Sequence, residues 1–410
     1  MPKLDAACAP ERALRTLRRP GEPTIFFDGR GGYDGRWPCR LLVRPSELPV
    51  RDLDGLAGVI AARRARGGSG GTGVAVAMRY EGAFVAFSGD ASLTFLDDQT
   101  IGAGDRTLLQ EVERRLESRA ALGHGAIASG VPRTSLPRER YLAAVRRIHD
   151  HIREGDIYQA NLTQTFTRSI AGDPWPLYEA LTSRWPAPRS AYLESGDGGA
   201  ALLSISPEQF VDVTADGRAE TRPIKGTRRR HDDPDRDRRA AEELAASEKD
   251  RAELVMIVDL ERNDLGRIAR TGSVRVPELL ALESYPTVHH LVARVTAHLE
   301  DGVGAADLIR AVFPGGSIVG APKERAMEIL RTLEPVPRGF YTGSLFWFDD
   351  DGSTQSSILI RSIVVARGLA YVGAGGGIVA DSDPEAEWVE SNDKARALTG
   401  ALGFTPEEAS

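Results

Sequence analysis

The stretch RERYLAAVRRIHDHIREGDIYQANLTQTF, residues 138–166, changes its hydrophobic period halfway along. Apolar side chains recur at helical spacing from Leu142 to Ile152, which predicts one amphipathic helix. Gly155 interrupts that pattern, and the residues after it alternate between polar and apolar. We therefore predict a helix that ends at Gly155, followed directly by a β-strand over residues 157–166.

The predicted strand has one polar face. Side chains alternate across a strand, so Gln159, Asn161 and Thr163 point to one side, and Ala160 and Leu162 point to the other. A polar face on an otherwise buried strand indicates the lining of a cleft. An ordinary half-exposed strand would give the same pattern, and this stretch alone leaves both interpretations open.

Further strands are predicted along the chain, separated by glycine-rich turns. They cover 24–28, 74–78, 200–213 (broken at Pro207), 341–348, 356–366 and 370–372. Helices are predicted over 238–258 and 384–398, whereas 131–137 and the charged run 228–239 are predicted as loops. Because strands and helices do not alternate regularly, the pattern predicts an α+β protein with largely antiparallel sheets.

The composition narrows the class of protein. The 410 residues carry a net charge of −7, which gives no electrostatic footprint for nucleic acid. No apolar run reaches the roughly 18 residues of a membrane span, and Asp5 and Glu11 stand where a secretory signal would be apolar. Two cysteines, Cys8 and Cys39, are too few for a disulfide framework. We expect a cytoplasmic protein that binds neither nucleic acid nor membrane.

Lysine is rare in this chain. Only five of the 52 basic residues are lysine: Lys3, Lys225, Lys249, Lys323 and Lys394. A lysine amine can lose its proton, and an arginine effectively cannot. Each remaining lysine is therefore a candidate for a task that arginine cannot perform, although a few lysines could also remain by chance.

Lys225 lies in the segment PIKGT, residues 223–227. Its neighbours are small or apolar, and burial among them would favour the neutral amine, the form that acts as a nucleophile. A lysine at a strand end that points to solvent would have the same sequence context.

Two predicted helix faces are acidic. Asp250 and Glu253 lie three residues apart, and Glu387, Glu390 and Lys394 stack along a second helix. If the two faces meet, they form an oxygen-rich site that suits Mg²⁺, which favours a few carboxylates, water and an anionic substrate. Ordinary solvated helix surfaces would carry the same residues.

Two glycine-rich segments lack the standard nucleotide signatures. FPGGSIVGAPK at 313–323 has no Gly-Lys-Ser/Thr, and GAGGGIV at 373–379 has Ile378 where the dinucleotide fingerprint requires glycine. Either could present backbone N–H groups to a carboxylate, and either could be a tight turn.

Eight sequence blocks, in order, resemble the chorismate-utilising enzymes, which include anthranilate, aminodeoxychorismate, isochorismate and salicylate synthases. The blocks are GDIYQANLTQ (155–164), SPEQF (206–210), RPIKGT (222–227), SEKDRAELVMIVDLERNDLGR (247–267), HLVARV (290–295), FPGGSIVGAPK (313–323), GFYTG (339–343) and GAGGGIVADSDPEAEWVESNDKA (373–395). The resemblance implies two large, mostly antiparallel sheets packed as a sandwich, with helices outside. It implies a catalytic domain over 131–405 and a weakly matching portion, 1–130, packed on it.

The residues at two positions distinguish the branches of that family. Anthranilate synthases carry alanine where this chain has Lys225, and isochorismate and salicylate synthases carry a water-activating lysine where it has Gln159. The pair therefore resembles aminodeoxychorismate synthase component I, which implies Mg²⁺-dependent conversion of chorismate and ammonia to 4-amino-4-deoxychorismate for p-aminobenzoate and folate. The alternatives are synthesis of anthranilate or 2-amino-2-deoxyisochorismate, or a catalytically silent binding subunit.

The resemblance also implies residue roles. Lys225 would attack C2 of chorismate, and Glu208 would protonate the departing C4 hydroxyl. Mg²⁺ would be held by Glu253 and Glu390, with Asp250 and Glu387 close by. The remaining residues implied in substrate binding are Gln159, Thr227, His290, Tyr341, Arg361, Gly375, Gly376, Gly377 and Lys394.

Ammonia needs a source. Neither Cys8 nor Cys39 lies in a Gly-Cys-Gly nucleophile elbow, so a separate glutamine amidotransferase subunit is expected as partner. Three positions depart from the family pattern: Val319 and Ser362 replace the usual threonines, and Arg189 replaces a common aromatic. Arg189 lies near a region that binds regulatory tryptophan in some relatives, so that feature is not carried over.

Overall fold

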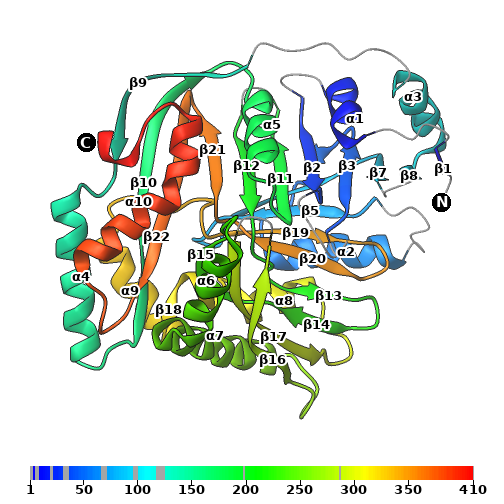
Figure 1. The fold of residues 1–410 in the computed structure, drawn as a ribbon. Helices are drawn as coiled ribbons and strands as arrows, with labels where there is room; N and C mark the ends of the chain where they lie inside the picture. The colour runs from blue at the N-terminus through cyan, green and yellow to red at the C-terminus, as the bar shows by residue number, and fades with distance from the viewer. Residues whose placement is uncertain are drawn as a thin grey trace.

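The computed structural model describes residues 3–4, 9–18, 22–30, 37–65, 72–95, 100–116, 125–196, 199–285 and 288–409. These residues form two large β-sheets (Figure 1). The first contains β1 (Lys3–Leu4), β2 (Thr24–Asp28), β3 (Cys39–Val43), β7 (Ala91–Phe95), β8 (Thr100–Gly104), β9 (Ile127–Thr134), β10 (Gln159–Ala171), β11 (Arg189–Glu194), β12 (Ala201–Ser206), β18 (Gly320–Ala321), β21 (Ser362–Ala366) and β22 (Leu369–Ile378). The second contains β4 (Ser46–Glu47), β5 (Val74–Met78), β6 (Phe84–Ser88), β13 (Asp212–Val213), β14 (Arg218–Thr221), β15 (Ile224–Arg229), β16 (Arg275–Ser284), β17 (Val288–His298), β19 (Ser344–Phe348) and β20 (Thr354–Ile358).

The two sheets pack against each other through an apolar layer. Ile25 and Phe27 of β2 belong to the same buried cluster as Leu345 and Trp347 of β19. The residue between the first two, Phe26, belongs to a different buried cluster on the opposite face of its sheet. This alternation follows from the two-residue period of a strand, and it gives both faces of the first sheet an apolar layer.

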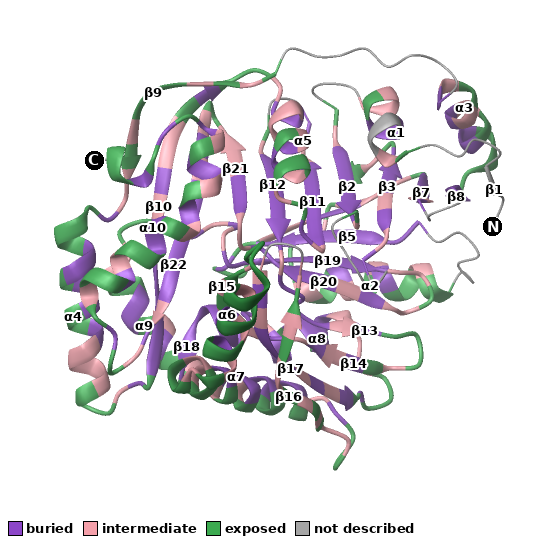
Figure 2. Ribbon diagram, in the orientation of Figure 1, coloured by how far each residue is buried: buried purple, intermediate pink, exposed green. Residues whose placement is uncertain are grey.

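The helices lie on the outer faces of the sheets (Figures 1 and 2). They are α1 (Pro10–Leu17), α2 (Leu53–Ala65), α3 (Arg106–Leu116), α4 (Arg138–Arg153), α5 (Trp175–Arg184), α6 (Pro234–Ala246), α7 (Glu248–Gly266), α8 (Ala305–Val312), α9 (Lys323–Leu333) and α10 (Pro384–Ala401), with short 3₁₀ turns η1 (Gly316–Ile318) and η2 (Pro406–Glu408). In the first sheet, α10 packs on β22 and α4 on β10; in the second, α6 and α7 pack on β15 and β17.

Several predictions from the sequence are confirmed. The helix before Gly155 is α4, and the alternating strand after it is β10, which continues to Ala171. Every pairing between β10 and its neighbours β9, β18 and β22 is antiparallel. The α+β sandwich with outer helices is therefore the observed fold.

The helix predicted over 238–258 is wrong as a single element. Ser247 has an extended backbone and separates α6 from α7, and its hydroxyl accepts a hydrogen bond from the N–H of Asp250. A serine that caps a helix in this way satisfies a backbone donor that a continuous helix would not leave free. The capped start of α7 positions the two acidic residues of its first turns.

Five other predictions are corrected. The loop 131–137 contains the end of β9, and the loop 228–239 contains the end of β15 and the start of α6. The strand 356–366 is two strands in different sheets, β20 and β21. The strand 341–348 begins only at Ser344, and the segment 373–379, offered as a tight turn, lies mostly within β22.

The N-terminal portion contributes strands to both sheets. β2 pairs with β11 in the first sheet, and β5 pairs with β19 in the second. The boundary between 1–130 and a catalytic domain of 131–405 stays a prediction. Cys39 is buried, whereas Asp5 and Cys8 lie outside the described residues. None of the helices in the described part is long and apolar enough to cross a membrane.

Candidate active site

Lys225 lies at a bulge in β15. The register between β15 and β17 shifts between Lys225 and Thr227, and Gly226 has a φ of 70°. A Cβ at Gly226 would lie 2.8 Å from Cγ of Asp250, so glycine is required both for the backbone angle and for this approach. The bulge leaves Nζ of Lys225 3.7 Å from Oε2 of Glu253, with both side chains largely buried.

Thr227 and His290 face each other across β15 and β17. The hydroxyl of Thr227 lies 3.0 Å from Nδ1 of His290, within hydrogen-bond distance. Burial lowers the pKa of His290, so its imidazole is neutral at pH 7 and can donate or accept a hydrogen bond.

Three of the four predicted carboxylates come together, and a lysine lies between two of them. Nζ of Lys249 is 4.0 Å from Oε1 of Glu253 and 3.3 Å from Oε1 of Glu387. The hydroxyl of Ser382 donates to Glu387 at 2.6 Å. Glu390 pairs with Lys394 at 2.7 Å. α7 and α10 therefore present a joint carboxylate cluster, an arrangement that the spacings left conditional and the resemblance implied.

Asp250 takes a different position from the other three carboxylates. Its Oδ2 lies 3.3 Å from Nη2 of Arg228, and its side chain packs against Gly226. The side chain therefore supports the bulge that carries Lys225. Asp250 acts on Glu253 only as a neighbouring charge.

The glycines of β22 border the carboxylate cluster. A Cβ at Gly376 would lie 3.2 Å from Oε2 of Glu387 and 3.6 Å from Nζ of Lys394. Lys394 also donates to the carbonyl oxygen of Gly375 at 3.1 Å. β21 pairs with β22 only as far as Val372, so within the described chain the next residues of β22 have a strand partner on one edge only. The free edge leaves backbone groups available to a carboxylate.

The polar face of β10 is buried, so the interpretation as a half-exposed strand is wrong, and the cleft lining stays a prediction. Gln159 is fully buried, and both polar atoms of its amide lack a hydrogen-bond partner among the residues that the structure describes. The hydroxyl of Thr163, four residues along the same face, is also without a hydrogen-bond partner in the described ranges. A Cβ at Gly377 would lie 2.4 Å from Nε2 of Gln159, so this glycine leaves the space that the amide fills. Buried polar atoms of this kind suit a polar ligand.

Glu208 is a buried acid, and one side chain in the described part of the chain donates a hydrogen bond to it. The hydroxyl of Ser317 donates to its Oε1 at 2.9 Å, and its own backbone N–H bonds to Ser206 at 3.2 Å. Burial raises the pKa of Glu208 to about 7, although the Ser317 bond and the charges of Lys225 and Lys394 oppose this rise. A carboxyl group that keeps its proton near neutral pH can act as a general acid.

Tyr341 and Arg361 lie where the chain changes sheet. The ring of Tyr341 packs on Gly373, where a Cβ would lie 2.1 Å from the ring. Burial raises the pKa of Tyr341 to about 12, so its hydroxyl stays protonated and can donate. Arg361 adopts a φ of 52° between β20 and β21 and donates to the backbone carbonyl of Lys394.

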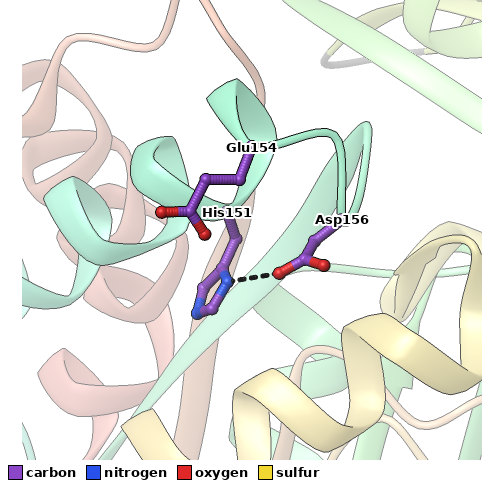
Figure 3. A group of neighbouring side chains, drawn as sticks. All are labelled: His151, Glu154 and Asp156. Atoms are coloured by element: carbon purple, nitrogen blue, oxygen red, sulfur yellow. Dashed lines mark hydrogen bonds and ion pairs between the residues drawn. The ribbon is translucent and has the colours of Figure 1, made fainter.

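Among the described residues, the tightest group of potential metal ligands lies elsewhere, at the C-terminal end of α4 (Figure 3). Ligand atoms of His151, Glu154 and Asp156 all lie within 4.8 Å of one another. Nδ1 of His151 is 2.8 Å from Asp156, and Arg325 pairs with the same carboxylate at 2.9 Å. These contacts already satisfy Asp156. The predicted carboxylates are more widely spaced, which suits a cation that keeps its waters and binds a substrate carboxylate.

Three contacts within the candidate site were missed from the sequence. Ser317, Ser382 and Lys249 all lie within the quoted blocks, but their partners come from distant elements. The scarcity of lysine was the only signal for Lys249. Lys323, by contrast, has a structural role, because it pairs with the buried Asp264 at 2.5 Å.

The chain matches the family described as chorismate binding enzyme over residues 72–400. It is 49% identical to aminodeoxychorismate synthase component 1 of Salmonella typhimurium over 66% of this chain and 59% of that protein. It is 46% identical to anthranilate synthase component 1 of Thermus thermophilus over 71% of this chain and 63% of the relative. The alignments thus span about three fifths of these relatives. The menaquinone-specific isochorismate synthase MenF of Escherichia coli has the same fold, with a TM-score of 0.80, 19% identity, and coverage of 97% of this chain and 92% of MenF.

Proposed function

Because this chain belongs to the family of chorismate binding enzymes, we propose that it replaces the C4 hydroxyl group of chorismate by an amino group. The product would be 4-amino-4-deoxychorismate, in line with the name of the Salmonella relative. The observation that carries the proposal is the amine of Lys225, 3.7 Å from Glu253 at the edge of a carboxylate cluster. Gln159, which cannot serve as a base for water, is buried on the polar face of β10.

The reaction would proceed in two displacements. The amine of Lys225 forms a bond to C2, both ring double bonds shift, and the C4–O bond breaks. Glu208 gives its proton to the departing hydroxyl, which leaves as water. Ammonia then forms a bond to C4, both double bonds shift back, and the C2–N bond to Lys225 breaks. The proton that the new C4 ammonium group loses restores the acid form of Glu208. Two easier steps replace one difficult displacement, and the lysine is regenerated.

We propose Mg²⁺ as the cofactor, held by Glu253 and Glu390 with Glu387 beside them, and with Asp250 acting through water. The donors are all carboxylate oxygens, which are the ligands that Mg²⁺ prefers. When bound, the cation would neutralise and orient a substrate carboxylate. The second carboxylate would meet Arg361, Tyr341 and the free edge of β22.

We also propose a partner and a pathway. The Salmonella relative is named as a component 1, which supports a second subunit, and a glutamine amidotransferase would supply the ammonia. The product would enter p-aminobenzoate and folate synthesis in the cytoplasm.

The test is direct. Purified protein is incubated with chorismate, Mg²⁺ and ammonium, and products are separated and identified by mass and fluorescence. We expect 4-amino-4-deoxychorismate, and none without ammonium. Anthranilate, isochorismate or unchanged chorismate would contradict the proposal.

The pH dependence of turnover should follow Glu208. A general acid must carry its proton, and the pKa of Glu208 is raised to about 7, so kcat should fall as pH rises through that value. Ser317→Ala removes a hydrogen bond that favours the charged form, so the midpoint should move to higher pH. The measurement is kcat against pH with free ammonia held constant. An unmoved midpoint in Ser317→Ala would remove Glu208 as the acid.

Glu253→Gln should weaken the Mg²⁺ dependence of the reaction. Loss of a carboxylate ligand should raise the Mg²⁺ concentration for half-maximal rate by roughly tenfold or more. Glu248→Gln, an exposed residue on the same helix, is the matched control and should titrate like the unaltered protein. If both variants titrate alike, Glu253 is not a ligand.

A further inference from the structure

One arginine is buried between the segments that carry the site. The Arg338 side chain, after α9, uses all five of its N–H donors. Nε and Nη2 donate to Glu334 at 2.9 and 2.7 Å. Nη1 donates to the carbonyl of Ile318 at 2.9 Å and to the hydroxyl of Thr342 at 3.3 Å. Nη2 also donates to the carbonyl of Asn161 at 2.6 Å.

The first of these segments carries the partner of the proposed general acid. Ile318 belongs to η1, and the residue before it, Ser317, donates to Glu208 at 2.9 Å. When Arg338 holds the carbonyl of Ile318, it fixes the turn that aims the Ser317 hydroxyl. Arg338 thus acts on Glu208 through two intermediate residues and does not touch it.

The other two segments carry substrate-facing residues. Asn161 lies on β10, two residues from Gln159 and on the same face. Thr342 follows Tyr341 and has a φ of 58°, an angle that a threonine rarely adopts without support. Its hydroxyl donates to the carbonyl of Tyr341 at 2.6 Å. One guanidinium therefore fixes both the polar strand and the tyrosine turn.

Two residues of the N-terminal portion, Tyr80 and Glu81, also contact Arg338 or the turn that carries it. The guanidinium carbon of Arg338 lies 4.2 Å from the centroid of the Tyr80 ring. The carboxylate of Glu81 accepts the backbone N–H groups of Arg338 and Gly339 at 2.8 and 3.3 Å. Residues far from the quoted blocks thus hold the same turn.

Glu334, the carboxylate that pairs with Arg338, also bonds to β10. Besides binding Arg338, Oε1 of Glu334 accepts the backbone N–H of Thr163 on β10 at 3.0 Å. A buried ion pair is weak evidence for stability alone, because desolvation offsets the attraction. The hydrogen bonds of Arg338 to three separate segments indicate instead that it positions those segments. A lysine has three donors and no planar guanidinium, so it cannot make the same set of hydrogen bonds.

We propose that Arg338 is a positioning residue that fixes Glu208 and Tyr341 relative to the polar face of β10. The inference rests on the proposed function only in taking Glu208 as the acid. Other charged or titratable groups act on Glu208 or are affected by it: Lys225 on β15, Lys394 on α10, Glu261 on α7 and Tyr341. Of these groups, only Tyr341 belongs to a segment that Arg338 holds. A dependence of the Ser317→Ala effect on Arg338 would therefore be specific evidence that Arg338 positions the partner of Glu208.

The experiment is a double-mutant cycle read on the pH midpoint of kcat. Arg338→Lys should lower kcat by roughly 10²-fold, the usual cost of a small misplacement of reacting groups. In the unaltered chain, Ser317→Ala should raise the midpoint by about one pH unit. In the Arg338→Lys background, Ser317→Ala should cause little further shift, because η1 is already displaced.

A merely structural arginine gives a different result. Arg338→Lys would then lower the melting temperature, yet folded molecules would keep the Ser317 bond and the full midpoint shift. Arg18→Lys is the matched control, since the side chain of Arg18 is only 5% exposed and pairs with Asp173 at 2.7 Å and Glu194 at 2.6 Å away from the site. It should lose thermal stability and leave the midpoint unchanged.

Two results would overturn the inference: an undiminished kcat in Arg338→Lys, or a full Ser317→Ala shift in both backgrounds. If Arg338→Lys gives too little folded or active protein, Glu334→Gln takes its place in the cycle, because it keeps the side-chain length and removes the charge. The cycle can be read on whichever chorismate product forms. A different product would contradict the proposed function and leave the test of Arg338 intact.

Discussion

Lys225→Ala should lower the rate of C4 amination by roughly 10²-fold or more, the loss expected when a covalent nucleophile is removed. Chorismate binding should largely survive, because the carboxylate cluster and Arg361 remain in place. Rate is measured as 4-amino-4-deoxychorismate formed with saturating ammonium, and binding by titration calorimetry with Mg²⁺ present. A variant that keeps the full rate would rule out the covalent route.

Lys225→Arg separates the nucleophile from its charge. Arginine keeps a positive group near Glu253, but its guanidinium does not act as an amine nucleophile. We therefore expect Lys225→Arg to be as slow as Lys225→Ala. Recovery of the rate in Lys225→Arg would mean that the residue acts by charge.

Gly375→Ala should damage both stability and activity. A Cβ at this position would lie 2.1 Å from the carbonyl oxygen of Leu162 on β10, and backbone atoms of a paired strand cannot move aside as a flexible side chain can. Overpacking of this kind lowers the free energy of unfolding by about 1–3 kcal/mol, and a clash with backbone belongs at the upper end. The displaced strands carry Gln159 and the acceptor of Lys394, so kcat should fall as well.

The matched control is Gly266→Ala at the end of α7. A Cβ there meets nothing within 4 Å, so the substitution should leave stability within about 1 kcal/mol of the unaltered protein. Urea denaturation of both variants, read by tryptophan fluorescence, gives the comparison. Equal midpoints would show that β10 can move away from Gly375 at little cost.

Hydrophobic periodicity and capping residues predicted the helices and strands that depend only on their own residues. α4 has a continuous apolar stripe, β10 has strict alternation, and α10 begins at proline. Local pattern failed where the decisive contact is distant. The segment 356–366 has strand-like residues throughout, and only packing against two different sheets requires the break at Arg361.

The candidate site shows the same division. The acidic faces of α7 and α10 were visible as spacings, and their approach to each other was expected only from the resemblance. The bulge at Gly226 and the bond from Ser317 to Glu208 join segments that are far apart in the chain, so no window of sequence contains them. The raised pKa of Glu208 depends on burial, which spacing does not reveal.

The strands from the N-terminal portion have a consequence for dissecting the protein. If residues 1–130 were removed, β11 would lose β2 in one sheet and β19 would lose β5 in the other. These two strands, which are buried along nearly their whole length, would then present unpaired backbone edges, which are templates for intermolecular pairing. The motif-bearing segment is therefore not expected to be an autonomous folding unit, and a shortened version should accumulate as aggregates.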